Sequence, residues 1–146
     1  HTKILIARIS NPYGPGQDFR KGVGFIDAAL KKSINGEKIE IWGDGMNVRD
    51  YIHIDDVCRM MISLFSYQGV YDTFNISSNK GTSQRDIIQL LVKMGLQPQV
   101  EYLSARSVDA KKIILKNERI MQIHEVPLIP IELGIENYYH WLCKES

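Results

Sequence analysis

"KILIARISNPYGPGQ", residues 3–17, indicates the fold class of this chain. Ile4 to Ile9 is a nearly unbroken apolar run, which is typical of a strand covered on both faces, as in a parallel sheet. The prolines and glycines that follow force the backbone into a sharp turn. Many enzymes use a rigid turn after a strand to present a polar group to a ligand, and here that group is Asn11.

Helical and strand patterns alternate in the next part of the chain. Gly22 to Asn35 has apolar residues at helical spacing, and Lys38 to Trp42 alternates apolar and polar residues as a strand does. Gly43-Asp44-Gly45 is expected to form a tight turn, from which Val48 to Ile54 returns as the second strand of a hairpin. The pattern predicts a mixed α/β protein.

The remaining elements continue the alternation. A helix is expected with Asp55 as its N-cap, and its core stripe is Val57, Met60, Met61, Leu64 and Phe65. Val70 to Ile76 is a predicted strand, and Ser83 with Asp86 resembles a capping box that starts another helix. After a strand at residues 99–103, a last helix begins near Pro130. Its expected inner side carries Leu133, Asn137 and Trp141.

Composition excludes several classes of protein. The 146 residues carry a net charge of +1, with 44% hydrophobic and 24% charged residues, which gives no electrostatic footprint for nucleic acid. No apolar run reaches the roughly 18 residues of a membrane span, and no signal-peptide pattern starts the chain. Cys58 and Cys143 are expected to be free thiols, which fits a cytoplasmic protein.

Four side chains suit an anionic, aromatic ligand. Asn11 follows a buried strand, Trp42 can stack on a planar base, and Arg49 and Arg106 can each fork onto a diphosphate. The alternative is structural, because each arginine has an aspartate nearby for a surface ion pair, and Trp42 can be a core residue.

The sequence contains no motif typical of a metal site or of a catalytic nucleophile. Asp55 and Asp56 can hold a metal, but a helix cap with a favourable dipole charge is the simpler explanation. His53, between two isoleucines, is more typical of a packed strand residue than of a catalyst. No glycine-rich phosphate loop, Cys/His cluster or nucleophile elbow is present.

Three stretches taken together resemble one family. They are "RISNPYGPGQ" (8–17), "GEKIEIWGDGMNVRDYIHIDDV" (36–57) and "YDTFNISSNKGTSQRDI" (71–87). In this order they are similar to the C-terminal half of the extended short-chain dehydrogenase/reductases, above all to nucleotide-sugar epimerases and dehydratases of the UDP-glucose 4-epimerase kind. The resemblance covers roughly residues 3–115.

The resemblance implies a role for each matching residue. Asn11 contacts the substrate phosphates, and Ser10 lies against the nicotinamide end of NAD. Arg49 and Arg106 grip the diphosphate, and Asp109 closes the same site. The other matching positions are Glu40, Ile41 and Trp42 along the uracil and Phe25 and Ile26 at the start of the substrate helix.

Parts of the family pattern have no counterpart in the chain. The family binds NAD with a glycine-rich turn and moves protons with a Tyr-x-x-x-Lys pair, and neither is present, so we assign no catalytic residue. The expected architecture is one strand of a doubly wound, Rossmann-type parallel sheet whose N-terminal half is absent (residues 1–17), followed by a small mixed α/β nucleotide-sugar-binding domain (18–146). NAD is then bound mainly by the missing half, and the chain alone is expected to be inactive.

The implied activity is reversible oxidation of a sugar hydroxyl on a nucleotide diphosphate sugar, expected to be UDP-linked. A dehydratase or reductase of the same family is the nearest alternative, and a non-catalytic nucleotide-sugar-binding module is another. Without sheet neighbours, Ile4 to Ile9 is expected to be disordered or paired with another chain. We therefore expect a homo-oligomer, and neither a nucleic-acid nor a membrane partner.

Overall fold

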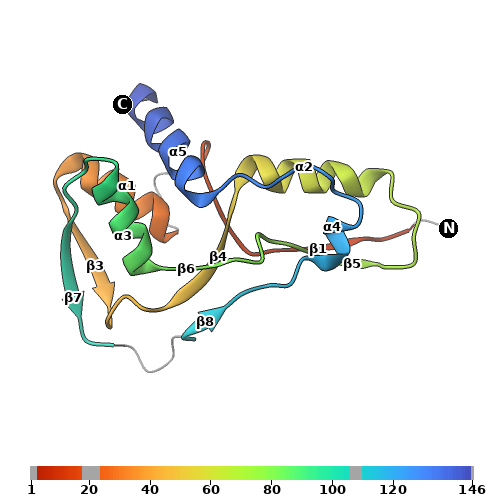
Figure 1. The fold of residues 1–146 in the computed structure, drawn as a ribbon, viewed down its shortest axis with the longest axis horizontal. Coiled ribbons are helices and arrows are strands. Elements are labelled where there is room, and N and C mark those ends of the chain that lie inside the picture. The colour runs from red at the N-terminus through yellow and green to blue at the C-terminus, as the bar shows by residue number, and fades with distance from the viewer. Residues whose placement is uncertain (1–2, 18–23, 106–109, 146) are drawn as a thin grey trace.

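The computed structural model describes residues 3–17, 24–105 and 110–145. It is an elongated α/β structure in which β4 links two ends of the molecule (Figure 1). At one end, α1 and α3 lie beside β3 and β7, and at the other end α2 lies along β1 and β5. The mixed α/β class predicted from the sequence is confirmed.

Within the described residues, the strands form three small sheets with covering helices. The strands are β1 (Ile6–Ile9), β2 (Asn11–Tyr13), β3 (Lys38–Trp42), β4 (Val48–His53), β5 (Thr73–Ile76), β6 (Gly81–Ser83), β7 (Gln99–Leu103) and β8 (Lys112–Ile113). The helices are α1 (Phe25–Asn35), α2 (Ile54–Phe65), α3 (Gln84–Lys93), α4 (Glu118–Met121) and α5 (Ile131–Glu145). β1 pairs with β5 and β3 with β7, both in parallel. β4 is parallel to β2 and β8 and antiparallel to β6.

The expectation that Ile4 to Ile9 lacks a sheet neighbour within the chain was wrong, whereas its pairing with another chain stays a prediction. β1 is ordered and finds a parallel partner, β5, within the chain. Among the described residues it has this one neighbour, so its other edge is open. Its side chains are also less covered than a central strand requires, since Ile6 is 50% and Ile9 44% exposed.

The predicted hairpin between residues 38 and 54 was also wrong. β3 has the predicted extent and β4 ends one residue earlier than predicted, at His53, but the two strands belong to different sheets. Gly43 and Gly45 both have positive φ, 86° and 75°, and the chain uses this freedom to cross from one sheet to the next. The prediction of a glycine turn at residues 43–45 was therefore correct, but the prediction that this turn pairs the two strands was not.

The helix caps are partly as predicted. Ser83 and Asp86 form the expected capping box at the start of α3. At α2 the cap is His53 instead of Asp55, because the Asp55 backbone N–H donates to His53 Nδ1 at 3.2 Å. The first helix begins at Phe25, and the earlier part of its predicted range, residues 22 and 23, lies outside the described residues.

Two apolar clusters hold these elements together. One joins α1, β3, α3 and α5, and the other joins α2, β5 and Ile52 of β4. Two predicted core faces need correction, since Phe65 of α2 is 86% exposed and α5 does not bury Leu133 or Asn137. Instead α5 packs through Ile135, Tyr138 and Leu142.

The helices of the described segments include none that is long and apolar enough to cross a membrane. The boundary between residues 17 and 18 that the sequence suggests stays a prediction.

Candidate functional site

One face of β2 and β4 carries a row of polar and aromatic side chains. Asn11 pairs with Tyr51 and Tyr13 pairs with His53, and since side chains alternate along a strand, Arg49 shares this face with Tyr51. The face borders a cavity of about 250 Å³. Its walls also include the first turn of α1, the end of β3 and the start of α3.

The cavity brings together five of the residues singled out in the sequence: Asn11, Phe25, Ile26, Trp42 and Arg49. Glu40 is exposed on β3 and Ile41 is fully buried in the core, and neither lines the cavity. Arg106 and Asp109 lie outside the described residues. Because Trp42 and Arg49 come from different sheets, it is the packing of the two sheets that makes them neighbours.

Trp42 is at the end of β3 and is 37% exposed. This exposure contradicts the alternative that Trp42 is a core residue. Its neighbour along the chain, Ile41, takes the core position of the alternating strand instead. An indole at the edge of a cavity can stack on a planar ring, so Trp42 has the surroundings that base binding requires.

Arg49 is held by carbonyl groups. Its Nη1 donates to the backbone oxygens of Val48 at 2.9 Å and Ala110 at 2.7 Å. The proposed surface pair with Asp50 is absent, because consecutive strand residues point to opposite faces and Asp50 is fully buried. Among the described residues, no carboxylate forms an ion pair with Arg49. The guanidinium is thus held in place, and its remaining N–H groups can donate hydrogen bonds to an anion.

Asp50 joins three distant segments to β4, a role that sequence reasoning missed. Its Oδ1 accepts hydrogen bonds from the Ser10 hydroxyl at 3.2 Å, the Ser78 backbone N–H at 2.9 Å and the Ser78 hydroxyl at 2.8 Å. Its Oδ2 accepts from the backbone N–H groups of Asn79 at 3.1 Å and Leu115 at 3.2 Å. A carboxylate with this many donors can remain buried.

The backbone of Asp50 also holds Asn11, whose Nδ2 donates to the Asp50 carbonyl oxygen at 2.9 Å. The second Nδ2 hydrogen is left for another acceptor. Asp50 therefore fixes Asn11 through its carbonyl group and Ser10 through its carboxylate. It also follows Arg49 directly in the chain. One buried residue connects three candidate site residues.

Ser10 borders a second, larger cavity of about 510 Å³. This cavity lies at the carboxyl end of β1 and is lined mainly by the turn at residues 11–17, with Gly24 and Ile54. The Ser10 hydroxyl does not act as a donor towards this cavity in the structure, because it donates to Asp50.

Two tyrosines that the sequence did not single out line the first cavity. Burial raises the pKa of Tyr51 to about 12, with Arg49 acting in the opposite direction, and burial, together with Asp56 and Glu132, raises the pKa of Tyr13. Both are therefore neutral hydrogen-bond donors at ordinary pH. The alternation of polar residues along β2 and β4 is the signal that predicts their position.

The cavity also contains amide groups that sequence reasoning missed. Asn47 and Gln84 both line it, and within the described part of the chain the buried Gln84 Oε1 has no hydrogen-bond partner. A buried acceptor without a partner is unfavourable unless a ligand or water supplies a donor. Nothing in the local sequence pattern around Gln84 indicated this.

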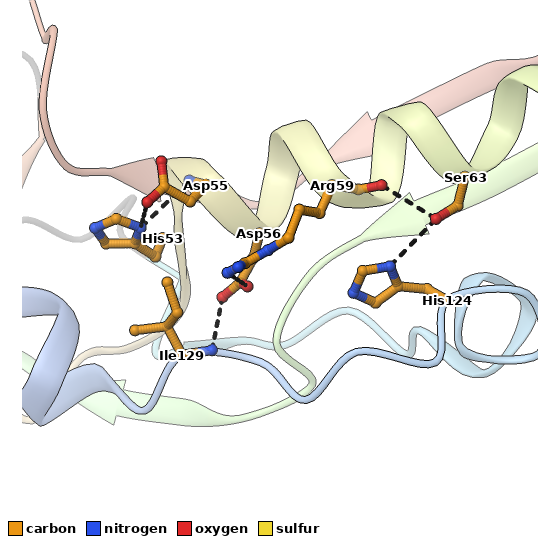
Figure 2. Close-up of polar contacts among 7 residues, drawn as sticks. All are labelled: His53, Asp55, Asp56, Arg59, Ser63, His124 and Ile129. Carbon is orange, nitrogen blue, oxygen red and sulfur yellow. Dashed lines mark hydrogen bonds and ion pairs between the residues drawn. The ribbon is translucent and has the colours of Figure 1, made fainter.

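A row of polar contacts runs along α2 (Figure 2). Asp56 accepts from Arg59 Nη2 at 2.7 Å and from the Ile129 backbone N–H at 2.9 Å, and Ser63 contacts His124 Nδ1 at 3.2 Å. These contacts attach residues 124–129 to α2. Groups of three or more metal-ligating side chains do not occur among the described residues.

His53 closes this row at the start of α2. It is buried, as the sequence indicated, its Nδ1 caps the helix, and its ring meets that of Tyr13 edge-on at 5.5 Å. Its Nε2 is buried without a partner among the described residues. Burial lowers the pKa of His53, although Asp55 and Asp56 act in the opposite direction.

The lowered pKa of His53 predicts a loss of stability in mild acid. The unfolded chain takes up a proton on this histidine as pH falls through about 6.5, whereas the folded chain resists it, so the free energy of unfolding decreases below that pH. Urea unfolding at about pH 7.5 and about pH 5 measures the difference. His53→Asn keeps a capping side chain and should flatten this dependence, and an equal slope in both proteins would contradict the assignment.

Comparisons with known proteins found similar sequences and similar structures. The model of the NAD dependent epimerase/dehydratase family matches residues 1–77. Among curated proteins, dTDP-4-dehydro-6-deoxyglucose reductase of Escherichia coli is 31% identical over 92% of this chain and 43% of its own length. A dTDP-4-dehydro-6-deoxy-D-allose reductase of Streptomyces is 30% identical, with 96% and 43% covered. The crystal structure of Thermotoga maritima UDP-glucose 4-epimerase with UDP-glucose has a TM-score of 0.87 and 28% identity, with 97% of this chain and 46% of that chain covered. The chain thus spans less than half the length of the proteins it matches.

Proposed function

Because this chain belongs to the NAD dependent epimerase/dehydratase family, we propose that it is the nucleotide-sugar-binding part of an epimerase of the UDP-glucose 4-epimerase kind. The observation that carries the proposal is the single cavity that gathers Asn11, Trp42 and Arg49 from three different strands. In this role the chain holds the nucleotide so that the sugar reaches the reacting groups.

The three side chains match the parts of a nucleoside diphosphate. Trp42 offers an aromatic face to the base, and Arg49 donates to the diphosphate through a guanidinium that two carbonyl groups already hold. Asn11 adds an amide hydrogen for a phosphate oxygen. Since these groups are in place before binding, little conformational entropy is lost when the ligand enters.

The second cavity suits the nicotinamide end of NAD. It lies at the carboxyl end of the parallel strand β1, and in α/β sheets ligands bind outside such strand ends. NAD, when bound, accepts a hydride from the sugar and returns it. Ser10 and the turn at residues 11–17 form the wall of this cavity, and Asp50 keeps Ser10 in position.

The chain contributes positioning and no bond-making residue. No tyrosine in the sequence has a lysine four positions later, and Tyr13 and Tyr51, which line the cavity, have raised pKa values that disfavour the tyrosinate form. Holding a substrate in the reactive geometry is itself a large part of catalysis. We infer that the proton-transfer groups of the whole protein are supplied from outside this chain.

A reductase acting on a dTDP-linked sugar is the second candidate. The observation in its favour is that the two curated relatives at 30% and 31% identity are both named as reductases of dTDP-4-dehydro-6-deoxy sugars. The two candidates share the diphosphate-binding role of Arg49 and differ in the base and the sugar.

Calorimetric titration of the full chain with UDP and with dTDP tests the proposal. We expect both nucleotides to bind, with UDP the tighter ligand if the epimerase candidate is correct and dTDP the tighter if the reductase candidate is correct. Inorganic sulfate at the same concentration is the control for general anion binding. Failure of both nucleotides to bind more tightly than sulfate would refute the function proposed for the cavity.

A further inference from the structure

A carboxylate lines the cavity in which a diphosphate is proposed to bind. Asp27, in the first turn of α1, is 2% exposed and is part of the same cavity lining as Arg49. A carboxylate repels phosphate groups, so its presence here requires an explanation. The roles assigned above to the cavity do not use it.

Two partners hold the Asp27 carboxylate in one orientation. Its Oδ1 accepts a hydrogen bond from the Tyr138 hydroxyl of α5, and its Oδ2 accepts from Lys31 Nζ at 2.8 Å, one turn further along α1. Burial raises the pKa of Tyr138, and Asp27 raises it further, so the tyrosine remains a neutral donor. Each carboxylate oxygen has two acceptor sites, so both oxygens retain capacity for another donor.

A hydrogen-bond donor and a hydrogen-bond acceptor therefore lie on different walls of the cavity. Arg49, from β4, can only donate hydrogen bonds, and Asp27, from α1, can only accept them while it is ionised. Among the described residues the two form no ion pair with each other. A ligand that satisfies both must carry acceptors at one end and donors at the other.

Gln84 provides an independent indication of the same requirement. Its Oε1 is buried beside this cavity and has no partner within the described part of the chain. The Asp27 oxygens each have one donor and can accept another, whereas this oxygen has none and needs one. A diphosphate has no donor to offer, whereas a nucleoside has ribose hydroxyl groups and, in uracil or thymine, an imide N–H.

We propose that Asp27 is a specificity-determining residue that accepts a hydrogen bond from the nucleoside and so orients the nucleotide, with its diphosphate towards Arg49. This inference rests on the proposed nucleotide-binding function and adds the direction in which the ligand lies. Tyr138 and Lys31 act through Asp27 and are positioning residues.

A purely structural role for Asp27 makes a different prediction. If its only task is to tie α1 to α5, the Tyr138 hydroxyl matters as much as the carboxylate does. Tyr138→Phe removes that tie and leaves the carboxylate in the cavity. Asp27→Asn keeps an oxygen for Tyr138 and removes the charge, and Lys31, which is partly exposed, can turn to solvent.

The experiment measures the affinities of uridine, UDP and inorganic pyrophosphate for the full chain, by calorimetry and by competition against UDP. In Asp27→Asn, uridine and UDP should each bind about 10- to 100-fold more weakly, the range for one charge-assisted hydrogen bond. Pyrophosphate should bind as well as before or better, because a negative charge has been removed. In Arg49→Ala the pattern should be reversed, with uridine unaffected and pyrophosphate weakened.

Three results would overturn the inference. Unchanged uridine affinity in Asp27→Asn is one, and equal weakening of all three ligands is another. The third is an equal effect of Tyr138→Phe and Asp27→Asn on uridine. Each of these leaves the proposed function intact as long as UDP binds to the unmodified chain. Failure of both UDP and dTDP to bind to the unmodified chain would instead refute the proposed function itself, and the role of Asp27 with it. Circular dichroism of each variant confirms that the proteins compared are folded.

Discussion

Replacing Arg49 with alanine is expected to weaken UDP binding by about 1.5–3 kcal/mol, the range for charge-assisted hydrogen bonds. The guanidinium is already held by the carbonyl oxygens of Val48 and Ala110, so its full interaction with the diphosphate is realised on binding. Calorimetric titration of UDP into the variant and the unmodified chain measures the difference. Uridine, which lacks the diphosphate, should bind equally well to both.

Arg85→Ala is the matched control for this change. Arg85 is an exposed arginine of α3 whose guanidinium lies 6.0 Å from the ring centre of Tyr102, and it does not line the cavity. Its loss removes the same charge from the chain and should leave UDP affinity nearly unchanged. Arg49→Lys should retain only part of the binding energy, because an ammonium group cannot form the two parallel hydrogen bonds of a guanidinium. Equal UDP affinity in Arg49→Ala and the unmodified chain would disprove the assignment.

Replacing Asp50 with alanine should lower the free energy of unfolding by about 3–5 kcal/mol, as expected when a buried hydrogen-bond network is broken. The change leaves the backbone N–H groups of Ser78 and Asn79, in the β5–β6 turn, and that of Leu115 without their acceptor. Asp50→Asn should be intermediate, because the amide nitrogen would face the N–H donors of Asn79 and Leu115. Urea unfolding followed by circular dichroism measures both changes.

Asp86→Asn serves as the reference for losing a carboxylate that accepts hydrogen bonds at a less buried site. Asp86 accepts from Ser83 in the capping box of α3 and is exposed, so its replacement should lower the free energy of unfolding by about 1 kcal/mol. A loss in Asp50→Ala no larger than in Asp86→Asn would show that the three segments do not depend on Asp50.

The fold was predictable where the determining interactions are local. The alternation of β3 and the capping box of Ser83 and Asp86 involve neighbours in sequence, and the structure has both as predicted. The turn at Gly43 to Gly45 was compatible with a hairpin or with a crossover between sheets. That choice depends on β7, whose pairing with β3 involves residues about 60 positions away. Likewise, the buried face of α5 is selected by the cluster it joins, which its own sequence does not specify.

The same distinction applies to the candidate site. Asn11, Trp42 and Arg49 could be selected as candidates because each has a side chain suited to a nucleotide and a place in a recognisable motif, and the structure brings all three to one cavity. Asp50 and Asp27 could not, since their roles arise from contacts with residues 28 to 111 positions away. A lone aspartate in a strand or helix carries no local signal of burial.

The origin of Trp42 and Arg49 in two separate sheets has a mechanical consequence. A nucleotide that stacks on Trp42 and is held by Arg49 bridges the β3–β7 pair and the sheet built around β4. Bound nucleotide then acts as a crosslink that restrains the spacing of the two sheets. Amide exchange in the connection at residues 43–47, whose last residue Asn47 lines the cavity, should slow when UDP binds. The connection between the sheets, which replaces the expected hairpin, should therefore become more rigid when the nucleotide is bound.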